Sequence, residues 1–146
     1  MDAKGFTLME LMIVVIIVGI LSAVAIPNMG GWLAKRELDS TARGIFSHMQ
    51  QTRSEAIKQD TDVKICFDSA ATPNSYIVIT AGGDTVVPNT SFPSTAISIT
   101  SMNFAGIASM AANSTGFDRR GLALQSGTIT ITSTKAPSAD NERSIT

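Results

Sequence analysis

The chain has 146 residues, of which 11 are basic and 12 acidic, and a formal net charge of −1 at pH 7. This length suits a single domain, and the balanced charge excludes a global electrostatic field that would attract nucleic acid or an anionic membrane. The single cysteine, Cys66, excludes an intrachain disulfide and a cysteine-based zinc site.

The first predicted element is an apolar segment near the start of the chain. Phe6 to Ile26 has the length of a transmembrane helix, which needs about 20 apolar residues. Three interpretations stay open. The segment is a plain transmembrane helix, a secretory signal peptide in which Ala23-Val24-Ala25 matches the A-x-A cleavage pattern, or a helix retained after cleavage of the Gly5–Phe6 bond. A signal peptide normally begins with positive charge, whereas acidic residues here outnumber Lys4.

Glu10 is the charge that these interpretations must explain. A carboxylate at the centre of a bilayer costs about 2.5–3.5 kcal/mol, and less near the interface. Cleavage after Gly5 creates an amine on Phe6, about 6 Å from Glu10 along a helix axis. The two charges neutralise each other within one chain or, in a stack of axially shifted parallel helices, between neighbours. In the second case Glu10 sets the register of an assembly, as polar residues do in coiled coils.

The start of the chain reads Gly5-Phe6-Thr7-Leu8-Met9-Glu10, followed by the apolar segment. This pattern closely resembles the processing site of type IV pilins and type II secretion pseudopilins. The resemblance implies that a prepilin peptidase and N-methyltransferase of the inner membrane removes the leader, residues 1–5, and methylates Phe6. It also implies that Glu10 guides the subunit into a helical filament of pilins or pseudopilins. Gly19 and Pro27 stand where many family members carry a helix-weakening glycine and proline. Lys4 fits the cytoplasmic side of the membrane.

The next predicted element is an amphipathic helix from Trp32 to Gln59. Pro27 kinks or interrupts the helix before it, because proline removes a backbone donor and clashes one turn back. Apolar residues then recur at spacings of three, four and seven, which is typical of one buried helix face. The members of this stripe are Leu38, Ala42, Ile45, Phe46, Met49, Ala56 and Ile57.

Strands are predicted beyond the helix. Residues 62–67 alternate between apolar and polar side chains, and turn-like residues at 72–75 and 82–84 separate later segments. The further strands are expected at 76–80, 85–87, 96–104 and 127–132. The sequence therefore predicts an α+β, pilin-like fold: a long N-terminal helix, with a membrane half and an amphipathic half, packed on an antiparallel β-sheet.

Four parts follow along the chain. They are the prepilin leader at 1–5, the hydrophobic transmembrane or filament-core helix at 6–31, the amphipathic half at 32–59 and a β-rich periplasmic globular region at 60–146. The resemblance implies a single pass through the inner membrane, with the globular domain in the periplasm, before transfer to a pilus or pseudopilus.

Two later stretches resemble the minor pilins and pseudopilins of the GspH/FimT type. Arg53 to Cys66 is similar to the junction of helix and first strand, and Phe117-Asp118-Arg119-Arg120-Gly121 to a Phe-x-x-x-Gly stretch of the globular domain. The sequence departs from this group twice. A strand around Tyr76 replaces one that contains tryptophan, and Asn141–Thr146 lacks the basic Gly-Arg-x-Arg ending of the DNA-binding members. The resemblance implies a subunit that helps initiate, cap or decorate a type IV pilus or a type II secretion pseudopilus.

DNA binding during natural transformation is the first alternative function. Phosphate binding needs several basic residues on one surface, and the candidates are Arg119, Arg120, Lys135 and Arg143. A solvated turn, whose arginines bond local carbonyls or carboxylates such as Asp118, is the simpler interpretation. The second alternative is a soluble periplasmic protein made with a signal peptide.

No catalytic site, metal or cofactor is predicted, so we expect a structural subunit and not an enzyme. His48 is the sole histidine, and neither a carboxylate nor a nucleophile stands beside it on the helix. Cys66 has no helix N-terminus or histidine nearby to lower its pKa. Gly82-Gly83 lacks the lysine of a phosphate-binding loop. The aspartates around the first strand lack the spacing of a calcium loop.

Overall fold

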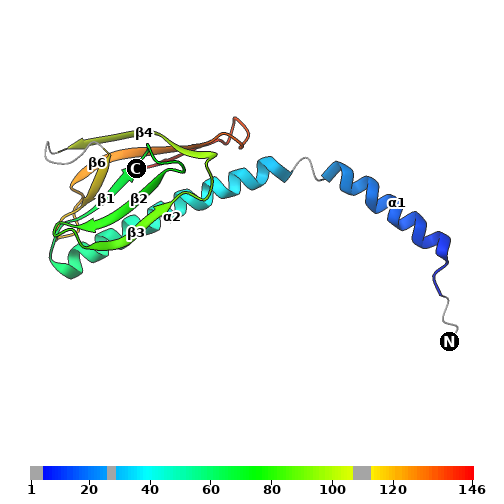
Figure 1. Ribbon diagram of the computed structural model, residues 1–146, viewed down its shortest axis with the longest axis horizontal. Coiled ribbons are helices and arrows are strands. Elements are labelled where there is room, and N and C mark those ends of the chain that lie inside the picture. Colours follow the sequence, from blue (N-terminus) through cyan, green and yellow to red (C-terminus); the bar gives the residue numbers. More distant parts are fainter. Residues whose placement is uncertain (1–4, 26–28, 107–112) are drawn as a thin grey trace.

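The computed structural model describes residues 5–25, 29–106 and 113–146. Its helices are α1 (Leu8–Ala25) and α2 (Met29–Gln59). Its strands are β1 (Val63–Asp68), β2 (Ser75–Thr80), β3 (Thr85–Ser91), β4 (Ile97–Gly106), β5 (Ser114–Phe117), β6 (Gln125–Ser133) and β7 (Glu142–Ile145). α1 projects from the body of the molecule, whereas α2 runs along the strands (Figure 1). The predicted interruption at Pro27 lies outside the described residues.

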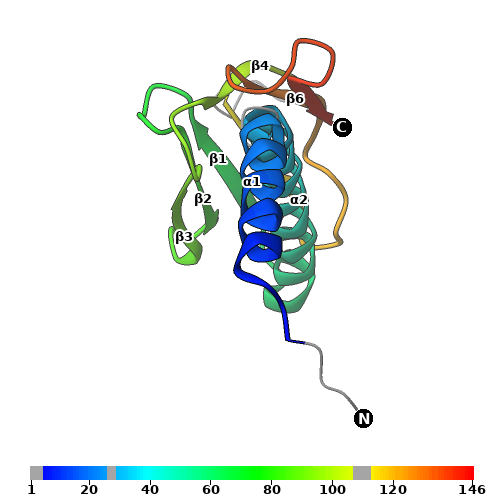
Figure 2. The same ribbon diagram turned by 90° about the vertical axis from the view of Figure 1, so that its right-hand side faces the viewer.

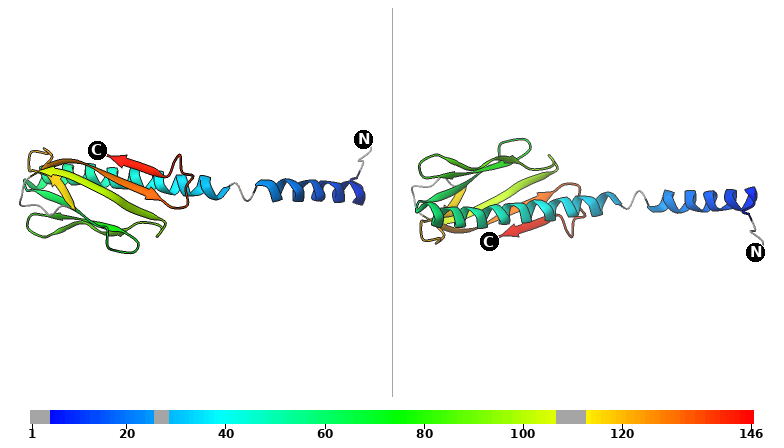
Figure 3. Two further views of the ribbon diagram at one scale, coloured as in Figure 1. Left: turned by 90° about the horizontal axis from the view of Figure 1, so that it is seen from above. Right: turned by 90° about the horizontal axis from the view of Figure 1, so that it is seen from below.

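Two antiparallel sheets make up the β region. The first has the strand order β3-β2-β1-β5 and the second the order β4-β6-β7. Seen along the helices, α2 lies in the angle between the two sheets (Figure 2). Seen from above and below, the strands flank α2 alone and α1 extends beyond them (Figure 3). This confirms the predicted class, a long N-terminal helix packed on antiparallel strands, and divides the strands into two sheets.

One face of α2 supplies the helical part of the core. Its buried residues are Ala34, Leu38, Ile45, Thr52 and Ala56. They share one hydrophobic core with side chains from both sheets, which include Val63, Ile65 and Phe67 of β1 and Ile129 and Ile131 of β6. Thr52 is tolerated there because its hydroxyl donates a hydrogen bond of 2.6 Å to the His48 carbonyl.

The predicted apolar stripe of α2 is correct at most of its positions and wrong at two. Leu38, Ile45 and Ala56 are fully buried, whereas Phe46 and Ile57 are each 52% exposed. Both exposed residues directly follow a buried one. Because one residue turns an α-helix by about 100°, that step carries the side chain off the buried face.

Two of the strands were not predicted. β5 contains Gly116, and β7 reads Glu-Arg-Ser-Ile, so neither shows alternation of apolar and polar residues. β5 forms because Gly116 allows a close approach to β1: a Cβ at this position would lie 2.3 Å from the Val63 carbonyl oxygen. The other predicted strands are present, with ends that shift by a few residues.

No described helix combines the length and the apolar character that a membrane crossing requires.

Candidate functional site

The predicted processing bond lies in a short segment that precedes α1. Gly5, Phe6 and Thr7 are not helical, and the Phe6 side chain is 82% exposed. No other part of the described chain comes within 4 Å of the place that a Cβ on Gly5 would take. Among the described residues, none packs on Gly5, and Phe6 is largely exposed.

Thr7 ends this segment as the N-cap of α1. Its hydroxyl oxygen accepts a hydrogen bond of 3.2 Å from the Glu10 backbone N–H, and its carbonyl accepts one of 3.2 Å from Leu11. Thr7-Leu8-Met9-Glu10 is a T-x-x-E sequence, the pattern of a capping box. This local signal is present in the four residues but was not among the features predicted from the sequence.

The cap places Glu10 in the first turn of α1. A negative charge is favourable there, because unpaired N–H groups give the helix a positive N-terminal end. Glu10 thus has a local stabilising position within its own chain. The register role predicted from the sequence would come in addition to it.

Beyond Glu10, α1 is apolar on every side. Its large apolar side chains from Leu8 to Leu21 are between 49% and 77% exposed. Ser22 does not create a polar face, because its hydroxyl donates a hydrogen bond of 2.7 Å to the Val18 carbonyl. A helix without a polar face is normally covered by protein or lipid on all sides. Burial of α1 therefore needs partners from outside this chain.

Gly19 lies within the continuous helix α1. Nothing comes within 4 Å of the place that its Cβ would take, so packing inside this chain does not require a glycine there. Glycine lowers helix stability by about 1 kcal/mol relative to alanine. Its helix-weakening role stays a prediction.

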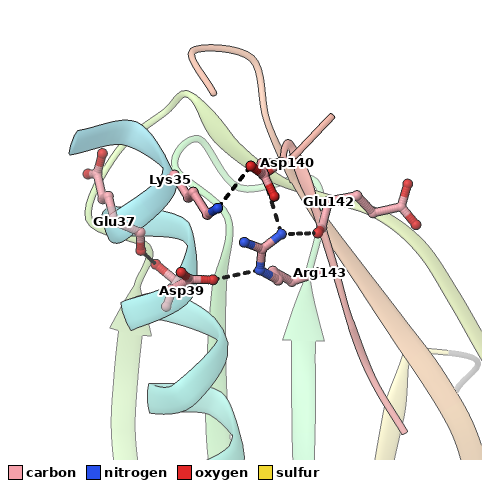
Figure 4. Close-up of polar contacts among 7 residues, drawn as sticks. Lys35, Glu37, Asp39, Asp140, Glu142 and Arg143 are labelled. Carbon is pink, nitrogen blue, oxygen red and sulfur yellow. Dashed lines mark hydrogen bonds and ion pairs between the residues drawn. The ribbon is translucent and has the colours of Figure 1, made fainter. Parts of the chain in front are cut away.

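Arg143, a predicted DNA contact, is engaged within the protein. Its Nε donates to Asp39 Oδ1 of α2 at 2.5 Å, and its Nη1 donates to the backbone carbonyls of Glu142 and Asp140 at 2.7 and 3.3 Å. Beside it, Lys35 Nζ lies 2.8 Å from Asp140 Oδ2 (Figure 4). The hydrogen bond from Lys35, together with its charge, holds the pKa of the Asp140 carboxyl below its usual value. We call Lys35, Asp39, Asp140 and Arg143 the C-terminal clasp.

Arg119 and Arg120 lie in the turn between β5 and β6. Arg120 Nε is 3.2 Å from Asp118 Oδ2, so this arginine bonds a local carboxylate, as the simpler interpretation of the turn expects. Asp118 Oδ1 also accepts backbone N–H groups from Leu122 and Arg120, each at 2.9 Å. The Leu122 N–H is the largest of the causes that lower the pKa of the Asp118 carboxyl.

The four predicted DNA contacts do not share one surface. Arg119 and Arg120 precede the first residue of β6, Gln125, whereas Lys135 follows its last residue, Ser133. A nine-residue strand spans about 30 Å, so these groups lie at opposite ends of the domain. The structure instead brings Arg53 of α2 to the arginine turn, because a Cβ on Gly121 would lie 3.3 Å from Arg53 Nε. The sequence did not predict this contact, because Arg53 and Gly121 are far apart along the chain.

His48 and Cys66 have structural surroundings. His48 Nδ1 is 2.7 Å from the hydroxyl of Tyr76, whose side chain is buried. Burial raises the pKa of the Cys66 thiol, and the nearby charge of Lys64 offsets this only in part. Among residues 5–25, 29–106 and 113–146, no group of three or more histidine, cysteine, aspartate or glutamate residues is placed to hold a metal ion.

Comparison with known proteins gives one match at the start of the chain and one over most of the remainder. Residues 41–146 match the family described as "Type II transport protein GspH", and residues 1–26 match the "Prokaryotic N-terminal methylation motif". The chain is 38% identical over 80 residues to the type IV major fimbrial protein FimA of Dichelobacter nodosus, covering 55% of this chain and 49% of that protein. It is 39% identical over 74 residues to a fimbrial protein of Pseudomonas aeruginosa, covering 44% and 48%. The chain thus spans about half the length of these relatives, and no solved structure matches it significantly.

Proposed function

Because this chain belongs to the family of type II transport protein GspH, we propose that it is a minor pilin or pseudopilin. In this proposal it is a structural subunit that helps initiate, cap or decorate a type IV pilus or a type II secretion pseudopilus. Residues 1–5 are the leader, 6–31 the membrane and filament-core segment, 32–59 the amphipathic half-helix and 60–146 the periplasmic globular region.

The observation that carries the proposal is the apolar surface of α1. Its side chains have no polar face to present to water, and the strands of this chain flank α2 and leave α1 uncovered. Burial of apolar surface stabilises by about 25 cal/mol per Å². Parallel helices of neighbouring subunits would supply that cover in a filament core, with the globular region outside.

Glu10 gives this packing a register. After cleavage, the new amine on Phe6 of one subunit would pair with the Glu10 carboxylate of a neighbour. An unpaired charge is costly in an apolar core, and pairing offsets that cost. Subunits in the wrong axial position would leave both charges unpaired, so the pair selects one stagger.

Before assembly, the proposal places the subunit in the inner membrane with residues 1–5 in the cytoplasm. The match of residues 1–26 to the methylation motif supports processing near the start of the chain. The partners are then the prepilin peptidase and N-methyltransferase, the lipid of the inner membrane, and other pilins or pseudopilins.

The test is an intact mass and an N-terminal sequence of the protein from a native membrane fraction. We expect a chain that begins at Phe6 and is heavier by one methyl group. A mature chain that begins at Ile26 would identify residues 1–25 as a signal peptide and would overturn the filament proposal.

DNA capture is a second candidate because Arg53 lies beside Gly121, in the turn that also carries Arg119. Neither arginine has an ion-pair partner among the residues that the structure describes. DNA binding by this surface predicts a salt-sensitive mobility shift of a DNA duplex, which the double substitution Arg53→Gln and Arg119→Gln abolishes. Lys135→Gln is the matched control, because this lysine lies at the other end of β6.

A further inference from the structure

We propose that Thr7 is a positioning residue for leader cleavage, because its hydroxyl caps α1 and keeps the Gly5–Phe6 bond outside the helix. This inference rests on the proposed function, since it concerns the same processing event. It adds a role for a residue that neither forms the scissile bond nor carries the assembly charge.

Two hydrogen bonds to Thr7 mark where α1 begins: the Glu10 N–H bonds its hydroxyl and the Leu11 N–H bonds its carbonyl. The Thr7 hydroxyl satisfies the Glu10 N–H, and the helix starts at Leu8. Upstream, Phe6 is 82% exposed and Gly5 has no neighbour within 4 Å of a virtual Cβ. Tertiary packing therefore does not hold Gly5 and Phe6 in their non-helical conformation. The helix start depends on Thr7.

Loss of the hydroxyl would favour a different helix start. Glycine is about as good an N-cap as threonine, so Gly5 is the next residue upstream that can take this position. A helix capped at Gly5 contains Phe6 in its first turn, and the scissile bond then joins the cap to the helix. A peptidase that binds extended backbone must first open that turn, and cleavage follows the population of the open form.

The experiment measures the initial rate of cleavage of the full-length precursor in membranes by a prepilin peptidase. Thr7→Val keeps the branched shape and removes the oxygen, whereas Thr7→Ser and Thr7→Asn keep an N-capping oxygen in a different shape. We expect Thr7→Val to be cleaved about fivefold more slowly, which corresponds to the roughly 1 kcal/mol typical of an N-cap. We expect the serine and asparagine variants to be cleaved at rates near that of the unsubstituted chain.

A second readout follows the helix start directly. In detergent micelles, the ¹³Cα chemical shift of Phe6 in the uncleaved precursor should move toward helical values in Thr7→Val and stay unchanged in Thr7→Ser. Equal cleavage rates for the valine variant and the unsubstituted chain would overturn the inference. So would rates that follow side-chain shape, with valine normal and asparagine slow, because the peptidase would then recognise the side chain itself.

Failure of the inference is distinct from failure of the proposed function. If the unsubstituted precursor is not cut between Gly5 and Phe6, as N-terminal sequencing of the product shows, the proposed function fails. If it is cut there and the rate ignores the capping ability of residue 7, only the role of Thr7 fails.

Discussion

Arg143 of β7 donates a hydrogen bond of 2.5 Å to Asp39 of α2, and so joins residues that are 104 positions apart in the chain. The pair is partly buried, with 26% of the arginine side chain and 36% of the aspartate side chain exposed. Together with Lys35 and Asp140 it forms the C-terminal clasp, which joins β7 and the residues just before it to α2 (Figure 4). Its strength is open to measurement.

We expect Arg143→Met to lower the free energy of unfolding by about 1–2 kcal/mol, since partly buried hydrogen bonds to charged groups exceed those at open surfaces. Urea denaturation of the full chain in detergent measures this. Lys64→Met is the control, because Lys64 has no ion-pair partner among the described residues, and it should change little. If both variants lose the same free energy of unfolding, the Arg143–Asp39 pair does not contribute to stability as proposed.

Stability should depend on pH through Asp140. Lys35 lowers the pKa of this carboxyl, so its folded-state pKa lies below the unfolded value of about 3.9. The pairing therefore stabilises the folded protein above that pH, and its contribution is lost as the pH falls through the lowered pKa. We expect Lys35→Met to be destabilising at about pH 6, and we expect this loss of stability to become smaller as the pH falls toward about 2. If the difference in the free energy of unfolding between Lys35→Met and the unsubstituted chain stays constant over this pH range, stability does not depend on the titration of Asp140.

Two glycines should respond in opposite ways to alanine. A Cβ on Gly116 would lie 2.3 Å from the Val63 carbonyl oxygen, so we expect Gly116→Ala to cost more than about 3 kcal/mol or to prevent folding. Gly44 lies within α2 with no atom within 4 Å of its virtual Cβ. Gly44→Ala should raise stability by about 1 kcal/mol. Thermal unfolding of both variants tests the close approach of β5 to β1 at Gly116. If Gly116→Ala folds and is as stable as the unsubstituted protein, this close approach is wrong.

Gln125 offers a stabilising substitution. Its Oε1 is buried without a hydrogen-bond partner in the part of the chain that the structure describes, beside a cavity of about 260 Å³ lined by Met49, Phe104, Phe117 and Ile145. An unpaired buried acceptor costs about 1–3 kcal/mol. Gln125→Met keeps the length of the side chain and should raise the free energy of unfolding by about 1 kcal/mol. Thr115→Val is the contrast, since its hydroxyl donates to the Gln125 carbonyl at 3.1 Å, and it should be destabilising.

Two substitutions at Glu10 separate its two roles. Glu10→Gln retains a side chain that serves in a capping box but removes the charge, whereas Glu10→Ala removes both. If the charge sets the register, both variants should insert in the membrane and both should be depleted from sheared filaments, as immunoblots of the two fractions would show. Normal incorporation of Glu10→Gln would reduce the role of Glu10 to local helix capping.

The sequence predicted what depends on neighbours along the chain. The fold class, most of the α2 stripe and most strands were visible in local patterns, and the predicted family is confirmed by the GspH match. Phe46 and Ile57 were misplaced because a helix wheel tolerates an error of one position. β5 and β7 were not predicted because their residues do not alternate between apolar and polar. These strands form by pairing with β1 and β6, which are distant from β5 and β7 or not recognisable as their partners from local sequence. The Arg143–Asp39 pair and the approach of Arg53 to Gly121 depend on tertiary structure, which no local pattern records. The Thr7 cap was local and was overlooked.

The way α2 is fastened determines how the domain bears tension. Near its start, Gly31 packs on Pro137 of the β6–β7 connection, and the C-terminal clasp follows; near its end, Ile57 packs against Gly121 of the β5–β6 turn. A pull along the axis of α2 would therefore load both sheets at once. Contacts loaded side by side in shear must yield together, whereas contacts loaded at one end peel apart in sequence. The geometry suits a domain that stays folded while tension acts along α2.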